Sequence, residues 1–101
     1  MVTKTKTNSE RYFEAVGRRK TATARVRITP ASKESFTVND KSLNDYFQTD
    51  ERQMIVKDAQ KNAGIEQKFN ITVKVVGGGI HAQSEAVRHG ISRALVEYDT
   101  N

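Results

Sequence analysis

The stretch that most restricts the fold is a strand pattern leading through three glycines into a helix pattern. From Lys68 to Val76, apolar and polar residues alternate, as in a strand with one buried face. From His81 to Asp99 the apolar residues recur at helical spacing: Val87, Ile91, Ala94, Leu95 and Tyr98. Each element has one apolar side to cover, so the pair predicts a helix packed on a sheet.

The remaining elements are predicted by the same reasoning. Tyr12 to Ile28 alternates and is expected to form a single half-buried strand that Pro30 ends, with a turn over residues 31–35. Ser35 to Val38 is expected to be its antiparallel partner. Ser42 is predicted to cap a helical turn with Leu43, Tyr46 and Phe47, and Thr49 or Asp50 to cap a helix that ends at Gly64 and buries Met54, Ile55, Ala59 and Ala63.

The predicted order is β-β-α-β-α, which indicates an α+β two-layer sandwich with helices on one face of a sheet. Residues 10–101 are expected to form a single globular domain of modest core. Residues 1–9 are polar and rich in Thr and Lys, and are expected to be a disordered leader.

Positive charge is concentrated near the start of the chain. The sequence has 17 Lys and Arg against 12 Asp and Glu. The residues before Pro30 hold eight basic and two acidic side chains, a formal +6. Such localised charge favours a polyanionic partner. The chain has no cysteine, no secretory signal pattern and no apolar run long enough to span a bilayer, so it is expected to be cytoplasmic and not membrane-bound.

Three features bear on chemistry. The first is Gly17-Arg18-Arg19-Lys20, followed by Arg25 and Arg27 at alternate strand positions, which would line up on one face. Gly17 suggests a bulge or a close backbone approach. Guanidinium and ammonium groups spaced in this way can each neutralise a phosphate. The alternative is a solubilising charge cluster.

The second feature is the junction Val75-Val76-Gly77-Gly78-Gly79-Ile80-His81. Glycines between a strand and a helix allow close backbone approach and can point amides at an anion. The patterns Gly-x-x-x-x-Gly-Lys-Ser/Thr and Gly-x-Gly-x-x-Gly are both absent. A tight turn without a ligand remains the alternative.

The third feature is the helix segment from Ala86 to Leu95. Arg88 and Ser92, and likewise His89 and Arg93, are four residues apart and form a polar stripe. Gly90 in mid-helix costs about 1 kcal/mol relative to alanine, which suggests a packing or backbone contact. A plain surface role for His89 is the alternative.

Catalysis finds little support in the sequence. Neither histidine has metal-ligand spacing, and most acidic residues are explained as helix caps and dipole partners. We therefore expect no enzyme, no cofactor, no metal and no small-molecule substrate. Two alternatives stay open: a phosphate-handling domain like a small-molecule kinase, and an RNA-independent protein-interaction module suggested by Met54, Ile55 and Val56.

Four blocks in order resemble the ribosomal protein S9 family of the bacterial small subunit. They are Gly17 to Val26, Ser42-Leu43 through Tyr46-Phe47, Ile71 to Gly79, and Ala86 to Leu95 with Glu97-Tyr98-Asp99. The resemblance implies a fold similar to the second domain of ribosomal protein S5, with a left-handed β-α-β crossover. It also implies a structural role in the small-subunit head, bound to the 3′ major domain of 16S ribosomal RNA beside neighbouring head proteins.

The resemblance also implies which residues face the RNA. On the basic strand and its turn they are Arg18, Arg19, Lys20, Thr21 and Arg25; around the glycines they are Lys74, Gly77, Gly78, Gly79, His81 and Gln83; on the helix they are Arg88, His89 and Arg93. Family members usually continue into a long basic tail. This sequence ends at Asn101, so we expect that tail to be lacking, which would account for a net charge of only +5.

Overall fold

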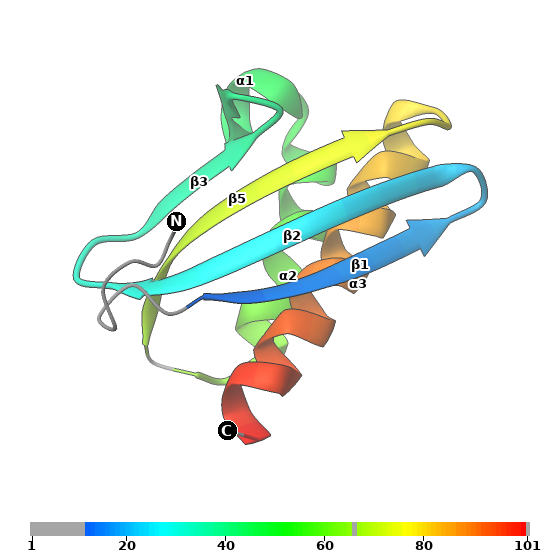
Figure 1. Ribbon diagram of the computed structural model, residues 1–101. Coiled ribbons are helices and arrows are strands. Elements are labelled where there is room, and N and C mark those ends of the chain that lie inside the picture. Colours follow the sequence, from blue (N-terminus) through cyan, green and yellow to red (C-terminus); the bar gives the residue numbers. More distant parts are fainter. Residues whose placement is uncertain (1–11, 66, 101) are drawn as a thin grey trace.

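A computed structural model describes residues 12–65 and 67–100 of the chain. It consists of a five-stranded sheet and three helices, with α2 and α3 lying behind the sheet in Figure 1 and the opposite face open. The elements are β1 Phe13–Arg19, β2 Ala22–Ala31, β3 Ser35–Val38, β4 Lys41–Ser42, α1 Leu43–Tyr46, α2 Asp50–Ala63, β5 Lys68–Val76 and α3 Ile80–Thr100. The predicted α+β class, with helices on one face, is confirmed. The predicted leader, residues 1–9, lies outside the described residues.

The sheet is mixed, with strand order β1-β2-β5-β3-β4. β2 pairs antiparallel with β1 on one side and with β5 on the other. β3 pairs parallel with β5 and antiparallel with the short β4. The core lies between the sheet and the two long helices, where the largest fully buried side chains include Phe47, Phe69, Ile28, Ile71 and Ile91.

The predicted strand from Tyr12 to Ile28 is wrong as a single element. It is a hairpin, β1 and β2, joined by a two-residue turn at Lys20 and Thr21. The buried positions are odd-numbered in β1, at Phe13 and Gly17, and even-numbered from Ala22 onwards. This change of phase is the mark of the turn, because side chains along one uninterrupted strand keep a strict period of two.

Two further predictions, the pairing partner of β3 and the end of the strand at Pro30, are also wrong. β3 is not the antiparallel partner of the first strand, because β1 and β5 already occupy both edges of β2; it pairs with the free edge of β5 instead. Pro30 does not end the strand, since it still lies opposite Phe69 within β2. The missing N–H is tolerated there because β1 begins opposite Ile28, so among the described residues no strand pairs with that edge of β2 at Pro30.

Most of the helix predictions are confirmed. Ser42 Oγ accepts a hydrogen bond from the Asp45 N–H at the start of α1, and Thr49 Oγ1 accepts one from the Arg52 N–H at the start of α2. Gly64 follows α2 with φ 66°, the left-handed conformation that favours glycine. The apolar stripe of α2 is wrong in part. Val56 and Ala59 are buried, whereas Met54 is 70% exposed, because the helix turns Val56 and Ala59 toward the core and Met54 toward solvent.

A pair of glycines brings α3 unusually close to β1. Gly17 and Gly90 are both buried and face each other. A methyl group on Gly17 would collide with the carbonyl oxygen of Ala86 and with the backbone of Gly90, and one on Gly90 would lie 2.7 Å from Val26 Cγ2. The backbone contact suggested for Gly90 is therefore confirmed. Gly17 marks a close approach and no bulge, since it stays in register opposite Ala24.

None of the helices in the described parts of the chain is long and apolar enough to cross a membrane.

Candidate nucleic-acid interface

The basic turn and the glycine corner lie side by side at one end of the molecule. In Figure 1 the tip of the β1–β2 hairpin and the connection from β5 to α3 meet at the right-hand side of the view. Thr23 pairs with Val76, and a methyl group on Gly77 would collide with the carbonyl oxygen of Thr21. Both segments are exposed to solvent, including Arg18, Arg19, Lys20, Thr21, Gly77, Gly78 and Gly79. One partner could therefore contact both at once.

The turn holds its cation in an uncommon backbone conformation. Lys20 has φ 56°, a left-handed value that disfavours side chains with a Cβ. A two-residue hairpin loop with positive φ fits the twist of the two strands it connects. Lys20 is therefore fixed at the tip of the hairpin, with its ammonium group directed away from the core and exposed to solvent.

The glycine corner is shaped mainly by its own turn. Gly77 and Gly78 have φ 81° and 66°, so both need the freedom of glycine. The Gln83 amide fixes the corner from α3, since its Nε2 donates to the Gly77 carbonyl at 3.0 Å and its Oε1 accepts from the Tyr46 hydroxyl at 2.6 Å. Gln83 thus holds the loop in place. This turn explains Gly77 and Gly78, but a methyl group on Gly79 would meet nothing within 4 Å.

Basic side chains line the open face of the sheet behind the turn. Arg25 on β2 lies opposite Lys74 on β5, and both are exposed on the side away from the helices. Arg18 on β1 points to the same face, one position nearer the turn. Arg25 and Lys74 are directly opposite, where Cβ atoms lie about 5 Å apart, and Arg18, which pairs with Thr23, is the diagonal neighbour of Arg25 at about 7–8 Å, so the three groups form a cationic row across the sheet.

Arg27 also lies on this face, but its guanidinium already contacts neighbouring side chains. Its guanidinium lies 3.4 Å from Glu14 Oε2 and 4.3 Å from the centre of the Tyr12 ring. The prediction that Arg25 and Arg27 share one exposed face is confirmed. Sequence reasoning missed the Tyr12 contact, and a Tyr next to a strand edge gave no signal for it.

Three of the candidate residues contact carboxylates. Arg19 Nε lies 2.7 Å from Glu85 Oε1, and His81 Nε2 lies 3.3 Å from Glu85 Oε2. Lys74 Nζ lies 3.2 Å from both oxygens of Asp40. Exposed pairs of this kind contribute about 0–1 kcal/mol, so a phosphate can compete for the cation.

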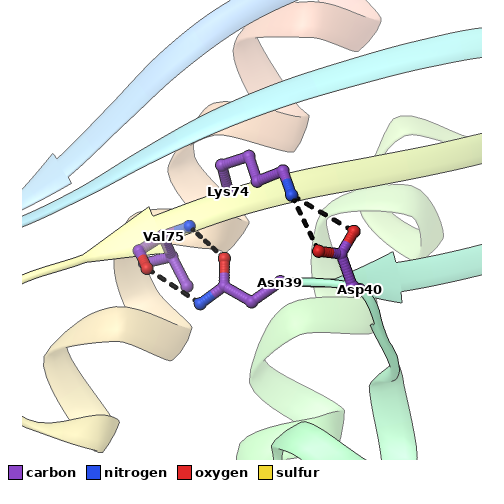
Figure 2. Close-up of polar contacts among 4 residues, drawn as sticks. All are labelled: Asn39, Asp40, Lys74 and Val75. Carbon is purple, nitrogen blue, oxygen red and sulfur yellow. Dashed lines mark hydrogen bonds and ion pairs between the residues drawn. The ribbon is translucent and has the colours of Figure 1, made fainter.

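Figure 2 shows how the end of β5 that carries Lys74 is held. Asn39 Oδ1 accepts from the Val75 N–H and Asn39 Nδ2 donates to the Val75 carbonyl, both at 2.9 Å, as a neighbouring strand would. The Asn39 N–H also donates to the Val73 carbonyl at 2.8 Å. Asn39 and Asp40 form the β3–β4 turn with φ 50° and 69°, which Asn and Asp tolerate best among residues with a Cβ. No signal in the sequence indicated this contact between Asn39 and Val75.

Replacing Asn39 by aspartate is expected to destabilise the protein by about 2–3 kcal/mol. The Val75 carbonyl would lose its donor and face a carboxylate, while backbone and shape stay the same. Chemical denaturation measures the change. Asn39→Gly is the matched variant, since it keeps the positive φ but removes both side-chain bonds without adding charge, and a smaller loss is expected. Equal losses for the two variants would contradict the argument.

The candidate residues on α3 divide between two surroundings. Arg93 donates to the carbonyl oxygen of Val16 at 2.9 Å, and His89 Nδ1 accepts a long 3.4 Å hydrogen bond from the Arg18 N–H. Both residues reach the outer edge of β1. Arg88 instead lines a groove between α2 and α3 together with Glu51, Asp58 and Glu85. The structure thus gathers the turn, the row and the corner, whereas Arg88 lies on another face.

Among residues 12–65 and 67–100, no group of three or more His, Asp or Glu side chains is arranged to hold a metal ion.

Comparison with known proteins agrees with the resemblance to ribosomal proteins that the sequence motifs indicate. The family described as Ribosomal protein S9/S16 matches residues 17–101. The protein named small ribosomal subunit protein uS9 of Desulfovibrio desulfuricans is 47% identical over 91 residues, which cover 90% of this chain and 69% of that protein. The chain therefore belongs to the ribosomal protein S9/S16 family, whose members are ribosomal proteins and not enzymes.

Proposed function

We propose that this chain is a structural component of the small ribosomal subunit that binds 16S ribosomal RNA in the 3′ major domain of the subunit head. The observation that carries this proposal is the adjacency of the basic turn, the cationic row and the glycine corner at one exposed end of the molecule. We assign RNA contacts to Arg18, Arg19, Lys20, Thr21, Arg25, Lys74, Gly77, Gly78, Gly79 and His81.

The electrostatics favour contact with the RNA backbone. Among the described residues, Arg18, Lys20 and Arg25 have no carboxylate within ion-pair distance, so their charge is free for phosphate. The corner offers backbone without bulky side chains beside them. Phosphate and sugar contacts position a protein on RNA without reading base sequence, so shape recognition is expected to dominate.

We do not assign direct RNA contacts to the other four candidate residues on α3, which are Gln83, Arg88, His89 and Arg93. The Gln83 amide and the Arg93 guanidinium already bond to the protein's own backbone, so they support the RNA-facing segments from behind. Arg93 and His89 are exposed at the edge of β1 and could extend the surface there. Arg88 is the candidate with the weakest support, because it lies among carboxylates.

We also propose that the fold is similar to the second domain of ribosomal protein S5, with a left-handed crossover. β3 and β5 are parallel neighbours, and α1 and α2 connect them. Viewed with both strands pointing upwards and the helices behind, β5 lies to the right of β3. A path that rises in front, returns behind and advances to the right is left-handed, against the general preference for right-handed crossovers.

RNA binding at different salt concentrations tests the proposal. The full chain is titrated against a labelled fragment of the 16S 3′ major domain and against a 5′-domain fragment of equal length. Three or four phosphate contacts predict that log K falls against log salt with a slope of about −2 to −4. Tighter binding to the 3′ fragment is expected. Equal affinity for both fragments, or a flat salt dependence, would refute the assignment.

A substitution at Glu85 is expected to strengthen RNA binding. It contacts both Arg19 and His81, so Glu85→Gln removes one negative charge from the proposed interface and releases the Arg19 guanidinium. RNA affinity in the same assay is expected to rise about two- to fivefold, the size of one exposed charge interaction. Glu34→Gln, at the far end of the sheet, removes the same charge and should have little effect. Weaker binding by Glu85→Gln would speak against RNA at this end.

A further inference from the structure

The groove between α2 and α3 differs in chemistry from the cationic end of the molecule. It has a volume of about 630 Å³ and is lined by Glu51, Met54, Ile55, Asp58, Glu85 and Arg88. The four α2 residues follow the helical spacing i, i+3, i+4, i+7, so they form one stripe beside the buried Val56 and Ala59. Apolar side chains thus sit among carboxylates on a surface that the core does not use.

We propose that this groove binds a segment of a neighbouring small-subunit protein in which Lys or Arg is flanked by apolar residues. The inference rests on the proposed function, since it supposes a place in the particle. An exposed fraction of 70% for Met54 is high for a large apolar side chain and leaves hydrophobic area available to a partner. The flexible thioether adapts to irregular partner surfaces.

The charges select a basic protein segment over RNA. In the described part of the chain neither Glu51 nor Asp58 forms an ion pair, and Asp58 only accepts a hydrogen bond from Asn62 at 3.0 Å. These two carboxylates lie one turn on either side of Met54 and outnumber Arg88, the one cation of the lining, so the groove would repel phosphates. A cation between apolar residues would meet both the carboxylates and the Met54 and Ile55 side chains. Complementary potentials of this kind select one partner chemistry over another.

Site-directed cross-linking in assembled particles tests the inference. The chain has no cysteine, so Met54→Cys, Lys61→Cys and Lys74→Cys each introduce a single thiol for a benzophenone label. Labelled full chains are assembled into small subunits, irradiated and digested with nuclease, and the adducts are mapped by mass spectrometry. Position 54 is expected to give a protein adduct at a basic, apolar-flanked segment, at least threefold above position 61 on the same helix.

Other adducts from position 54 would overturn the inference. They are an RNA adduct, an adduct to residues 1–11 of the same chain, an adduct to a second copy, or no adduct above that of position 61. Position 74 reports on the proposed function separately, because it should cross-link to ribosomal RNA. Failure at position 74 with assembly intact contradicts the RNA surface, whereas failure at position 54 alone contradicts only the protein-docking groove.

A peptide titration tests the chemistry without the particle. The probe is Leu-Lys-Leu-Lys-Lys-Leu, with Leu-Glu-Leu-Glu-Glu-Leu as its charge-reversed counterpart. Glu51→Gln combined with Asp58→Asn is expected to weaken the basic peptide about three- to tenfold, as two screened charge interactions would. The matched control, Glu34→Gln with Asp45→Asn, removes the same charge elsewhere and should leave binding unchanged. Equal effects of both pairs, or preference for the acidic peptide, would overturn the proposal.

Discussion

Gly17→Ala is expected to lower the free energy of unfolding by about 3 kcal/mol or more, at the upper end of the cost of overpacking a core. The new methyl group would collide with the backbone of α3 at Ala86 and Gly90, which cannot move aside as a flexible side chain can. Relief requires α3 to shift away from β1, and that shift would loosen the packing of buried Val87 and Ile91. Urea denaturation with an unchanged m-value would measure the loss.

Substitutions at two other glycines should destabilise the protein less than Gly17→Ala does. Gly90→Ala meets a side-chain methyl of Val26 at 2.7 Å and gains about 1 kcal/mol of helix propensity, so a smaller loss is expected than at Gly17. Gly79→Ala has open space and no positive φ, and should change stability by less than about 0.5 kcal/mol, as ordinary surface substitutions do. An equal loss at Gly17 and Gly79 would contradict the close approach of β1 and α3.

Removing the charges of Arg18, Lys20 and Arg25 together is expected to weaken RNA binding about 100- to 1000-fold at low salt. The variant combines Arg18→Gln, Lys20→Asn and Arg25→Gln, where asparagine is chosen because it accepts the left-handed φ of Lys20. Each lost phosphate contact also lowers the magnitude of the salt slope by about 0.7–0.9, so the triple variant should lose about two units of slope. Filter binding over a range of KCl concentrations measures both quantities.

A variant with the same net charge separates position from total charge. Lys33, Lys61 and Lys68 are exposed at the end of the molecule away from the turn, and changing all three to glutamine also removes three positive charges. This control should lose less than about tenfold in affinity, through long-range attraction alone. If it weakens binding as much as the interface variant does, the RNA does not depend on the turn and the cationic row.

The sequence predicted those elements whose signals are local. Lys68–Val76 is found as a strand with the stated bounds, and the caps at Ser42, Thr49 and Gly64 are in place. Each of these depends on side chains within a few residues. The partner of β3 could not be predicted in this way, because pairing with β5 depends on which sheet edges other strands leave free.

The hairpin at Lys20 could have been found. Its loop contains no Gly, Asn or Pro, so turn composition gave no warning. The apolar alternation nevertheless changes from odd to even positions across the loop, and that shift was readable. The position of Met54 was harder to predict, since an apolar stripe on a helix does not reveal which of its residues meet the core.

For the site, the sequence identified which residues bear charge but not what they contact. The cluster Arg18, Arg19 and Lys20 was apparent, whereas the Glu85 partner of Arg19 lies 66 positions away. The clamp of Asn39 on Val75 is equally non-local. Such contacts arise only when the chain is folded, and they decide which cations remain available.

The bonds from α3 to the outer edge of β1 bear on how the chain behaves when it is alone. β1 is the last strand on one side of the sheet. Unpaired backbone groups on such a strand can bind a strand of another molecule and start a fibril. Arg93 and His89 occupy the Val16 carbonyl and the Arg18 amide, so a second copy would have to displace them first. Truncating Arg93 should therefore promote self-association, visible as light scattering in samples that contain no nucleic acid.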